Sequence, residues 1–139
     1  MILNKDRLLI KKYVISFASL LIIFITLIIF QFSSFDTTVR ISRNISSYFL
    51  KSFRQRFNFN NIFFISRKIN RMIGINSCFK ICLSQKIIFS IFGYDVKIIS
   101  GIKKTVDDIL DGHAWLSYKE RPILESNENI DQYLESFVI

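Results

Sequence analysis

Three side chains in this sequence have the chemistry of nucleophiles or metal ligands: Cys78, Cys82 and His113, the single histidine. Asn76 and Ser77 are typical helix caps, so they place Cys78 in the first turn of a predicted helix. Unpaired backbone N–H groups and the positive end of the helix dipole favour a thiolate there. An imidazole can take the proton of a thiol and later protonate a leaving amine. The residue types suggest a nucleophile with its base. The alternative is a buried free cysteine with a structural histidine.

A third group usually orients the imidazole of such a pair. If the strand that carries His113 turns back at residues 119–122, Glu125 lies across from it, and its carboxylate could accept the imidazole N–H. Cys78, Cys82 and His113 could instead bind a metal, but structural zinc needs four ligands and the chain has no other cysteine or histidine. No glycine-rich phosphate loop occurs. We expect neither a metal nor a cofactor.

Helical spacing of apolar residues predicts four helices, over residues 3–32, 37–53, 57–73 and 78–92. Asp36 is the expected N-cap of the second helix, and Gly74 and Gly93 would end the third and the fourth. After Gly93 the apolar residues alternate, which is typical of strands.

Short β-branched segments predict strands over residues 94–102, 113–118 and 122–125. A charged loop over residues 103–112 would join the first two strands, and a further short element is expected from Tyr133. The fold class is therefore α+β, with N-terminal helices packed on the cysteine helix and a small antiparallel sheet.

Charge is divided unevenly along the chain. Residues 1–76 hold twelve Lys or Arg and two Asp, whereas residues 77–139 hold seven basic and nine acidic residues. Such a basic half meets an anionic surface or partner, or it carries solvated Lys and Arg on the backs of helices. Two cysteines four residues apart on a helix do not usually face each other in bridging geometry, so we expect a reducing, cytoplasmic setting.

Residues 13–32 form an apolar run without a charge, long enough to cross a bilayer as a helix. Basic residues flank both ends, so they set no orientation, and no small-residue cleavage site follows the run. The sequence leaves two alternatives open, a membrane-associated helix and a helix buried inside a small helical domain.

Basic and aromatic residues interleave over residues 54–64, a pattern that single-stranded nucleic acids can exploit. Helical spacing assigns these aromatic rings to a hydrophobic core instead. We expect no nucleic-acid partner.

The glycines after Cys78 carry a resemblance to a known family. The matching segments are Cys78 at a helix start, Gly93-Tyr94 at its end, Ser100-Gly101-Ile102 at a strand end, and Gly112-His113-Ala114-Trp115. Their order and spacing resemble the leader peptidases of lasso-peptide biosynthesis, which belong to the microcin-processing, transglutaminase-like cysteine peptidases. The resemblance covers about residues 76–126, and the N-terminal third is similar only in being helical, apolar and basic.

The resemblance implies a transglutaminase- or papain-like core over residues 76–139, preceded by a helical region over residues 1–75. It implies Cys78 as nucleophile and His113 as general base and acid. The third position falls on Glu125, where the family carries aspartate.

Two further positions depart from the family pattern. Phe79 stands where Leu-Pro is common, and Cys82 stands where the family has a small residue. Cys82 is therefore expected to pack within the helix. Asp131 is the fallback for the third catalytic position.

The implied activity is removal of the leader from a ribosomally made precursor peptide. In that family a separate ATP-dependent macrolactam cyclase then closes the ring, and a small separate protein usually binds the leader. The implied partners are therefore the precursor, the leader-binding protein and the cyclase. Two alternatives stay open: an acyl transferase of the same fold, and a non-enzymatic small membrane protein in which the Cys/His match is chance.

Overall fold

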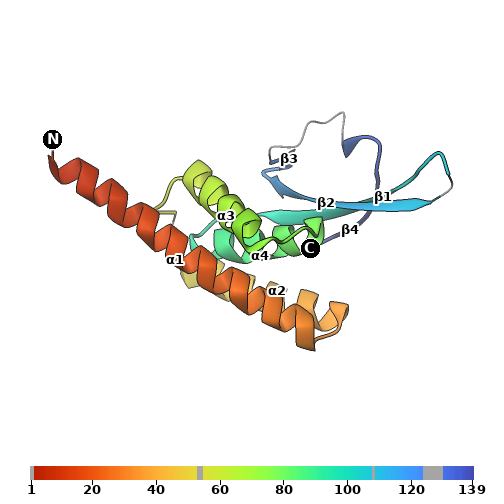
Figure 1. The fold of residues 1–139 in the computed structure, drawn as a ribbon, viewed down its shortest axis with the longest axis horizontal. Coiled ribbons are helices and arrows are strands. Elements are labelled where there is room, and N and C mark those ends of the chain that lie inside the picture. Colours follow the sequence, from red (N-terminus) through yellow and green to blue (C-terminus); the bar gives the residue numbers. More distant parts are fainter. Residues whose placement is uncertain (1, 53–54, 108, 124–129) are drawn as a thin grey trace.

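The computed structural model describes residues 2–52, 55–107, 109–123 and 130–139, and it confirms the predicted α+β class. The helices are α1 (Ile2–Phe32), α2 (Phe35–Ser52), α3 (Phe59–Ile73) and α4 (Cys78–Ile91). Helix α4 contacts all three other helices and two strands of the sheet. Figure 1 shows α1 running along the helical side of the molecule, with the sheet projecting away from it.

The strands form one antiparallel sheet in the order β3-β2-β1-β4. Their bounds are β1 (Lys97–Lys104), β2 (Leu110–Tyr118), β3 (Arg121–Pro122) and β4 (Leu134–Val138). Strand β1 pairs with β2 along the whole length of β1, with Gly101 opposite His113 and Ile99 opposite Trp115. The short element expected from Tyr133 is thus an edge strand that pairs with β1.

Local caps explain where most helices begin and end. Asn58 and Ser77 accept hydrogen bonds from backbone N–H groups at the starts of α3 and α4. Gly74 ends α3 with a left-handed φ of 79°, as predicted.

Two predicted boundaries were wrong. Asp36 is not an N-cap: α2 begins at Phe35, and the Ser34 hydroxyl accepts from the Thr37 N–H at 3.4 Å. Asp36 lies inside the first turn, where its negative charge interacts favourably with the positive end of the helix dipole. Residues 103–112 are also not all loop, because both strands of the hairpin continue through Lys104 and from Leu110.

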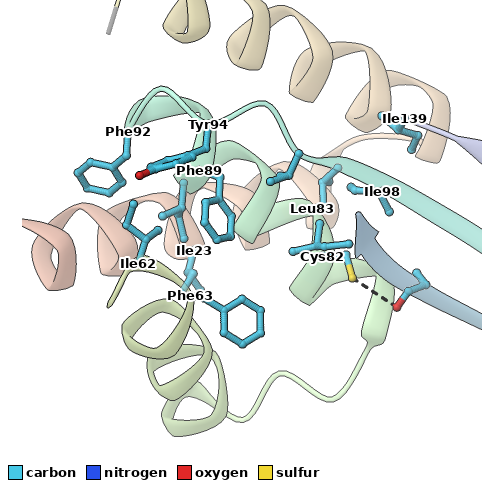
Figure 2. Packing of buried hydrophobic residues seen from close by; sticks show 14 of the residues in the cluster. Ile23, Ile62, Phe63, Cys82, Leu83, Phe89, Phe92, Tyr94, Ile98 and Ile139 are labelled. Atoms are coloured by element: carbon cyan, nitrogen blue, oxygen red, sulfur yellow. Dashed lines mark hydrogen bonds between the residues drawn. The ribbon is translucent and has the colours of Figure 1, made fainter. Parts of the chain in front are cut away.

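Helix α4 lies at the centre of one hydrophobic core. All nine residues from Cys82 to Ser90 are buried, and the core joins members of α1, α3, α4 and the sheet. Figure 2 shows Leu83 and Phe89 of α4 among Ile23, Ile62 and Ile98. The N-terminal helices and the C-terminal half therefore share this core.

One charged residue of α4, Lys86, is buried. The Lys86 ammonium donates to the Val96 carbonyl at 2.6 Å. Burial lowers the pKa of Lys86, and the nearby Asp95 carboxylate partly opposes this shift.

The aromatic residues of the basic segment pack as predicted for a core. Phe59 stacks on Phe89 and Tyr118 with ring centroids 4.5 and 4.9 Å apart, and Phe63 is buried. Phe64 is the exception among the described rings of this segment, because it is exposed.

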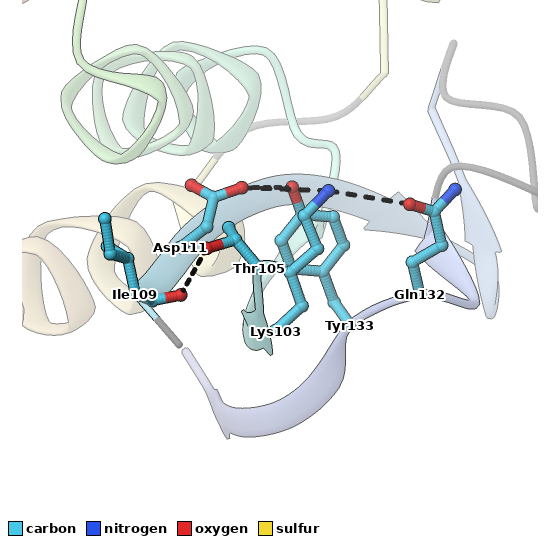
Figure 3. Close-up of polar contacts among 6 residues, drawn as sticks. All are labelled: Lys103, Thr105, Ile109, Asp111, Gln132 and Tyr133. Carbon is cyan, nitrogen blue, oxygen red and sulfur yellow. Dashed lines mark hydrogen bonds and ion pairs between the residues drawn. The ribbon is translucent and has the colours of Figure 1, made fainter. Parts of the chain in front are cut away.

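A second aromatic group covers the sheet face turned away from α4. The Tyr133 ring lies 5.4 Å from the His113 ring and 6.4 Å from the Trp115 ring. Figure 3 shows how Tyr133 is held: its hydroxyl donates to Asp111 Oδ2 at 2.9 Å, and Lys103 Nζ lies 3.7 Å from the same oxygen. This group fixes the surroundings of the imidazole.

Gly101 is required by that packing. A Cβ atom at Gly101 would lie 2.7 Å from Tyr133 Cβ and 3.1 Å from Trp115 Cη2. We expect Gly101→Val to lower the free energy of unfolding by about 1–3 kcal/mol, because the ring and strand must move apart. Urea unfolding followed by the fluorescence of the single tryptophan measures this.

Gly112→Val is the matched control, since a Cβ atom at Gly112 meets nothing within 4 Å and its strand position tolerates a β-branched residue. Its free energy of unfolding should change by less than about 0.5 kcal/mol. Equal losses for the two variants would contradict the packing described for Gly101.

Helix α1 carries an unusual surface for a helix in a small domain. Residues Arg7–Phe32 have a mean hydropathy of 2.7, so by length and composition the helix could cross a membrane. Its buried positions include Ser19 and Thr26, whereas Phe17 and Phe24 are 72% and 62% exposed. The helix thus buries small polar side chains beside Ile15 and Ile23, and it leaves many of its large apolar side chains exposed.

Candidate functional site

Cys78 is the first residue of α4 and is half-buried. The Ser77 side chain caps the helix by accepting from the Lys80 N–H, and the Ser77 carbonyl accepts from the Ile81 N–H at 3.0 Å. The N–H groups of Cys78 and Phe79 belong to the first turn and have no acceptor within the helix. The sequence predicted this position for Cys78, and the structure confirms it.

His113 lies in the middle of β2 and is half-buried. The neighbours Ala114 and Leu116 belong to the core that contains α4. Successive side chains of a strand point to opposite faces, so the imidazole lies on the face of Trp115 and Tyr133. The imidazole and α4 are therefore on opposite sides of the strand.

One pocket nevertheless joins the two predicted residues. Cys78 and His113 both line a cavity of about 200 Å³ between α3, α4 and the outer edge of β2. The cavity is smaller than the about 300 Å³ at which drug-sized ligand sites begin. It fits a side chain or a short stretch of peptide.

The second cysteine has a different environment. Cys82 is 7% exposed, and its thiol donates to the Ala114 carbonyl at 3.4 Å. Figure 2 shows this contact between α4 and β2. Cys82 packs within the core, as expected from its place on the helix, and its thiol joins α4 to the strand of His113.

A buried polar network fixes α3 against α4 behind the pocket. Gln85 Nε2 donates to Ser66 Oγ at 3.2 Å, and Ser84 Oγ donates to Asn70 Oδ1 at 3.3 Å. Asn70 Nδ2 donates to the Ser66 carbonyl, so the polar groups of the two helices satisfy one another. Gln85 and Asn70 also line the pocket.

Sequence reasoning did not assign the α3 residues of the pocket. Arg67, Asn70 and Arg71 line it together with α4 and β2. The signal was present, because three polar residues three or four apart mark one face of α3. Which residues contact that face depends on how α3 packs against the other elements. A local sequence pattern does not predict this packing.

The predicted third group is not placed by the structure, because Glu125 lies outside the described residues. Asp131 is exposed in the turn before Tyr133, whose ring contacts His113. Within the described part of the chain, no group of three His, Cys, Asp or Glu residues could hold a metal ion.

Comparison of the chain with known protein families, with curated proteins and with solved structures gave no match.

Proposed function

We propose that the chain is a cysteine peptidase that removes the leader from a ribosomally made precursor peptide. Cys78 is the nucleophile, and His113 is the general base and acid. The observation that carries the proposal is that these two residues, one at the start of α4 and one within β2, line the same pocket. The resemblance of the Cys78–Trp115 segment to lasso-peptide leader peptidases supplies the substrate class.

The chemistry follows from the two groups. The Cys78 thiolate attacks the scissile carbonyl carbon, and the first-turn N–H groups of α4 stabilise the oxyanion. The imidazole of His113 takes the thiol proton and gives it to the leaving amine as the C–N bond breaks. Water then hydrolyses the thioester, with the imidazole as base.

Proton transfer requires the imidazole to come within hydrogen-bond distance of the sulfur, and such contacts are often longer before substrate binds. Because His113 already lines the pocket, the proposal requires its imidazole to approach the Cys78 sulfur along the outer edge of β2 when substrate binds. The Ile123 N–H donates to the Leu116 carbonyl at 2.8 Å. Between Leu116 and the start of β2, no described strand pairs with this edge. Glu125, or Asp131 as the alternative, would orient the ring.

The proposal includes two protein partners. Helices α1, α2 and α3 and strands β1 and β2 pack against α4, and β3 and β4 extend the same sheet, so none of the described elements forms a separate leader-binding module. A small leader-binding protein would therefore present the precursor, and an ATP-dependent cyclase would use the freed N-terminus.

The test is cleavage of a precursor peptide by the full chain with its leader-binding partner, read by mass spectrometry. We expect two fragments whose masses add to the precursor plus one water, and loss of cleavage after alkylation with iodoacetamide. An added amine that appears in a product would instead identify an acyl transferase. Full activity after complete alkylation of Cys78 would exclude the proposed nucleophile.

We also propose that the protein works in the cytoplasm at a membrane surface, with α1 in contact with lipid. The exposed side of α1 is apolar over most of its length, and such surfaces on monomers are rarely this large unless they meet a partner or a bilayer. Lys11, Lys12 and Arg7 lie at the start of the apolar run, where anionic headgroups would meet them.

A further inference from the structure

The outer edge of β2, beside Cys78, presents backbone hydrogen-bonding groups that no described strand pairs with near His113. The backbone groups of Ile98 exchange hydrogen bonds with Ile139, so Ile98 and its partner Leu116 do not bond to each other across β1 and β2. Leu116 directs its carbonyl outward, to Ile123. In an antiparallel ladder this pattern alternates, so the N–H and C=O groups of Ala114 and Gly112 also face outward.

This edge borders the pocket that contains Cys78. Strand β3 pairs with β2 only at Ser117 and Tyr118, and no other strand among the described residues covers the edge nearer His113. An extended peptide could therefore pair with Gly112 and Ala114 as an added strand and pass Cys78. The Ala114 carbonyl is engaged by the Cys82 thiol, which leaves its N–H as the outward group.

Two arginines of α3 line the pocket together with β2. Arg67 and Arg71 lie one turn apart on α3, both are exposed, and both line the pocket. Neither forms an ion pair with a described residue, and the described lining contains no Asp or Glu. The Arg67 guanidinium is 5.6 Å from the centre of the Phe63 ring, which orients it.

We infer that the pocket takes an extended peptide with a carboxylate side chain close to the scissile bond. The edge of β2 would bind the peptide backbone, and the two arginines would bind the Asp or Glu side chain, because guanidinium forks match carboxylates. This inference rests on the proposed peptidase function for the role of Cys78. It adds the charge preference of the substrate.

Binding can be measured without cleavage. The full chain with Cys78→Ala is titrated into fluorescent peptides that are acetylated and amidated, alternate Thr and Val, and differ only in a central Asp, Asn or Lys. We expect about tenfold tighter binding of the Asp peptide than of the Asn peptide, as for a hydrogen bond to a charged group. Amidation ensures that a terminal carboxylate does not produce the effect.

The charge-reversed chain provides the decisive comparison. Arg67→Glu with Arg71→Glu should lose the preference for Asp and favour the Lys peptide. Lys68→Glu is the matched control, because Lys68 is exposed on the same helix but does not line the pocket. Equal affinities for the three peptides, or an equal effect of Lys68→Glu, would overturn the inference.

The peptidase proposal and the inferred preference for acidic peptides can be contradicted independently. If the wild-type chain cleaves the precursor but shows no preference for acidic peptides, the charge inference is wrong and the peptidase stands. If the Asp peptide binds as expected but no cleavage of any peptide occurs, the binding site stands and the peptidase is wrong.

Discussion

Cys78→Ala is expected to abolish precursor cleavage, with a loss of about 10³-fold or more in kcat/KM. Removal of a nucleophile removes the covalent step itself, so the rate falls to what binding and oxyanion stabilisation alone provide. The side chain is half-buried at the edge of a pocket, so alanine leaves the fold in place. Cleavage rates and the free energy of unfolding are measured on the same preparations.

Cys82→Ala is the matched control for this prediction. Cys82 also lines the pocket, but its thiol is directed to the Ala114 carbonyl. We expect most of the cleavage activity to survive, with a stability loss of about 1 kcal/mol, typical of a buried substitution. The reverse pattern, in which Cys82→Ala is inactive and Cys78→Ala is active, would move the nucleophile to Cys82.

Helix boundaries were predictable because caps act locally. Ser77 and Gly74 each determine a helix end through hydrogen bonds or dihedral angles within a few residues. The same local rule also explains the error at Asp36, since Ser34 is an equally good cap two residues earlier.

The extent of the strands was harder to predict, because charged residues resemble a loop. Lys103 and Asp111 occupy the hairpin that was expected to be irregular, yet they lie opposite each other and form an ion pair across the strands. The pairing of β4 with β1 joins segments far apart in the sequence. Local propensity does not encode such a pairing.

In the candidate site, too, local features were predictable and packing between elements was not. The sequence predicted Cys78 and His113 as the reactive pair, and strand alternation places His113 on the same face as Trp115. It did not predict which face α4 covers, because that depends on Ala114 and Leu116 packing against the helix. Arg67 and Arg71 join the pocket only after α3 docks through its polar network with α4.

The exposed apolar side of α1 is expected to bind lipid. Phe17→Asp combined with Phe24→Asp should release the full chain from lipid vesicles that contain anionic headgroups. Each phenylalanine contributes about 1.5–3 kcal/mol when its ring leaves water, so the double variant should bind at least about 10²-fold more weakly. Flotation of the protein with vesicles measures the bound fraction. Both side chains are exposed, so the fold should be retained.

Val106→Asp combined with Leu110→Asp is the matched control. Both residues are exposed and apolar, and they lie at the far end of the β1–β2 hairpin, which Figure 1 shows projecting away from α1. This variant gains the same charge and should still float with the vesicles. Release of both variants would indicate general charge repulsion from the anionic surface, and retention of the α1 variant would show that another surface binds lipid. Release of the α1 variant alone would identify α1 as the membrane contact, because only that variant removes apolar side chains from its exposed face.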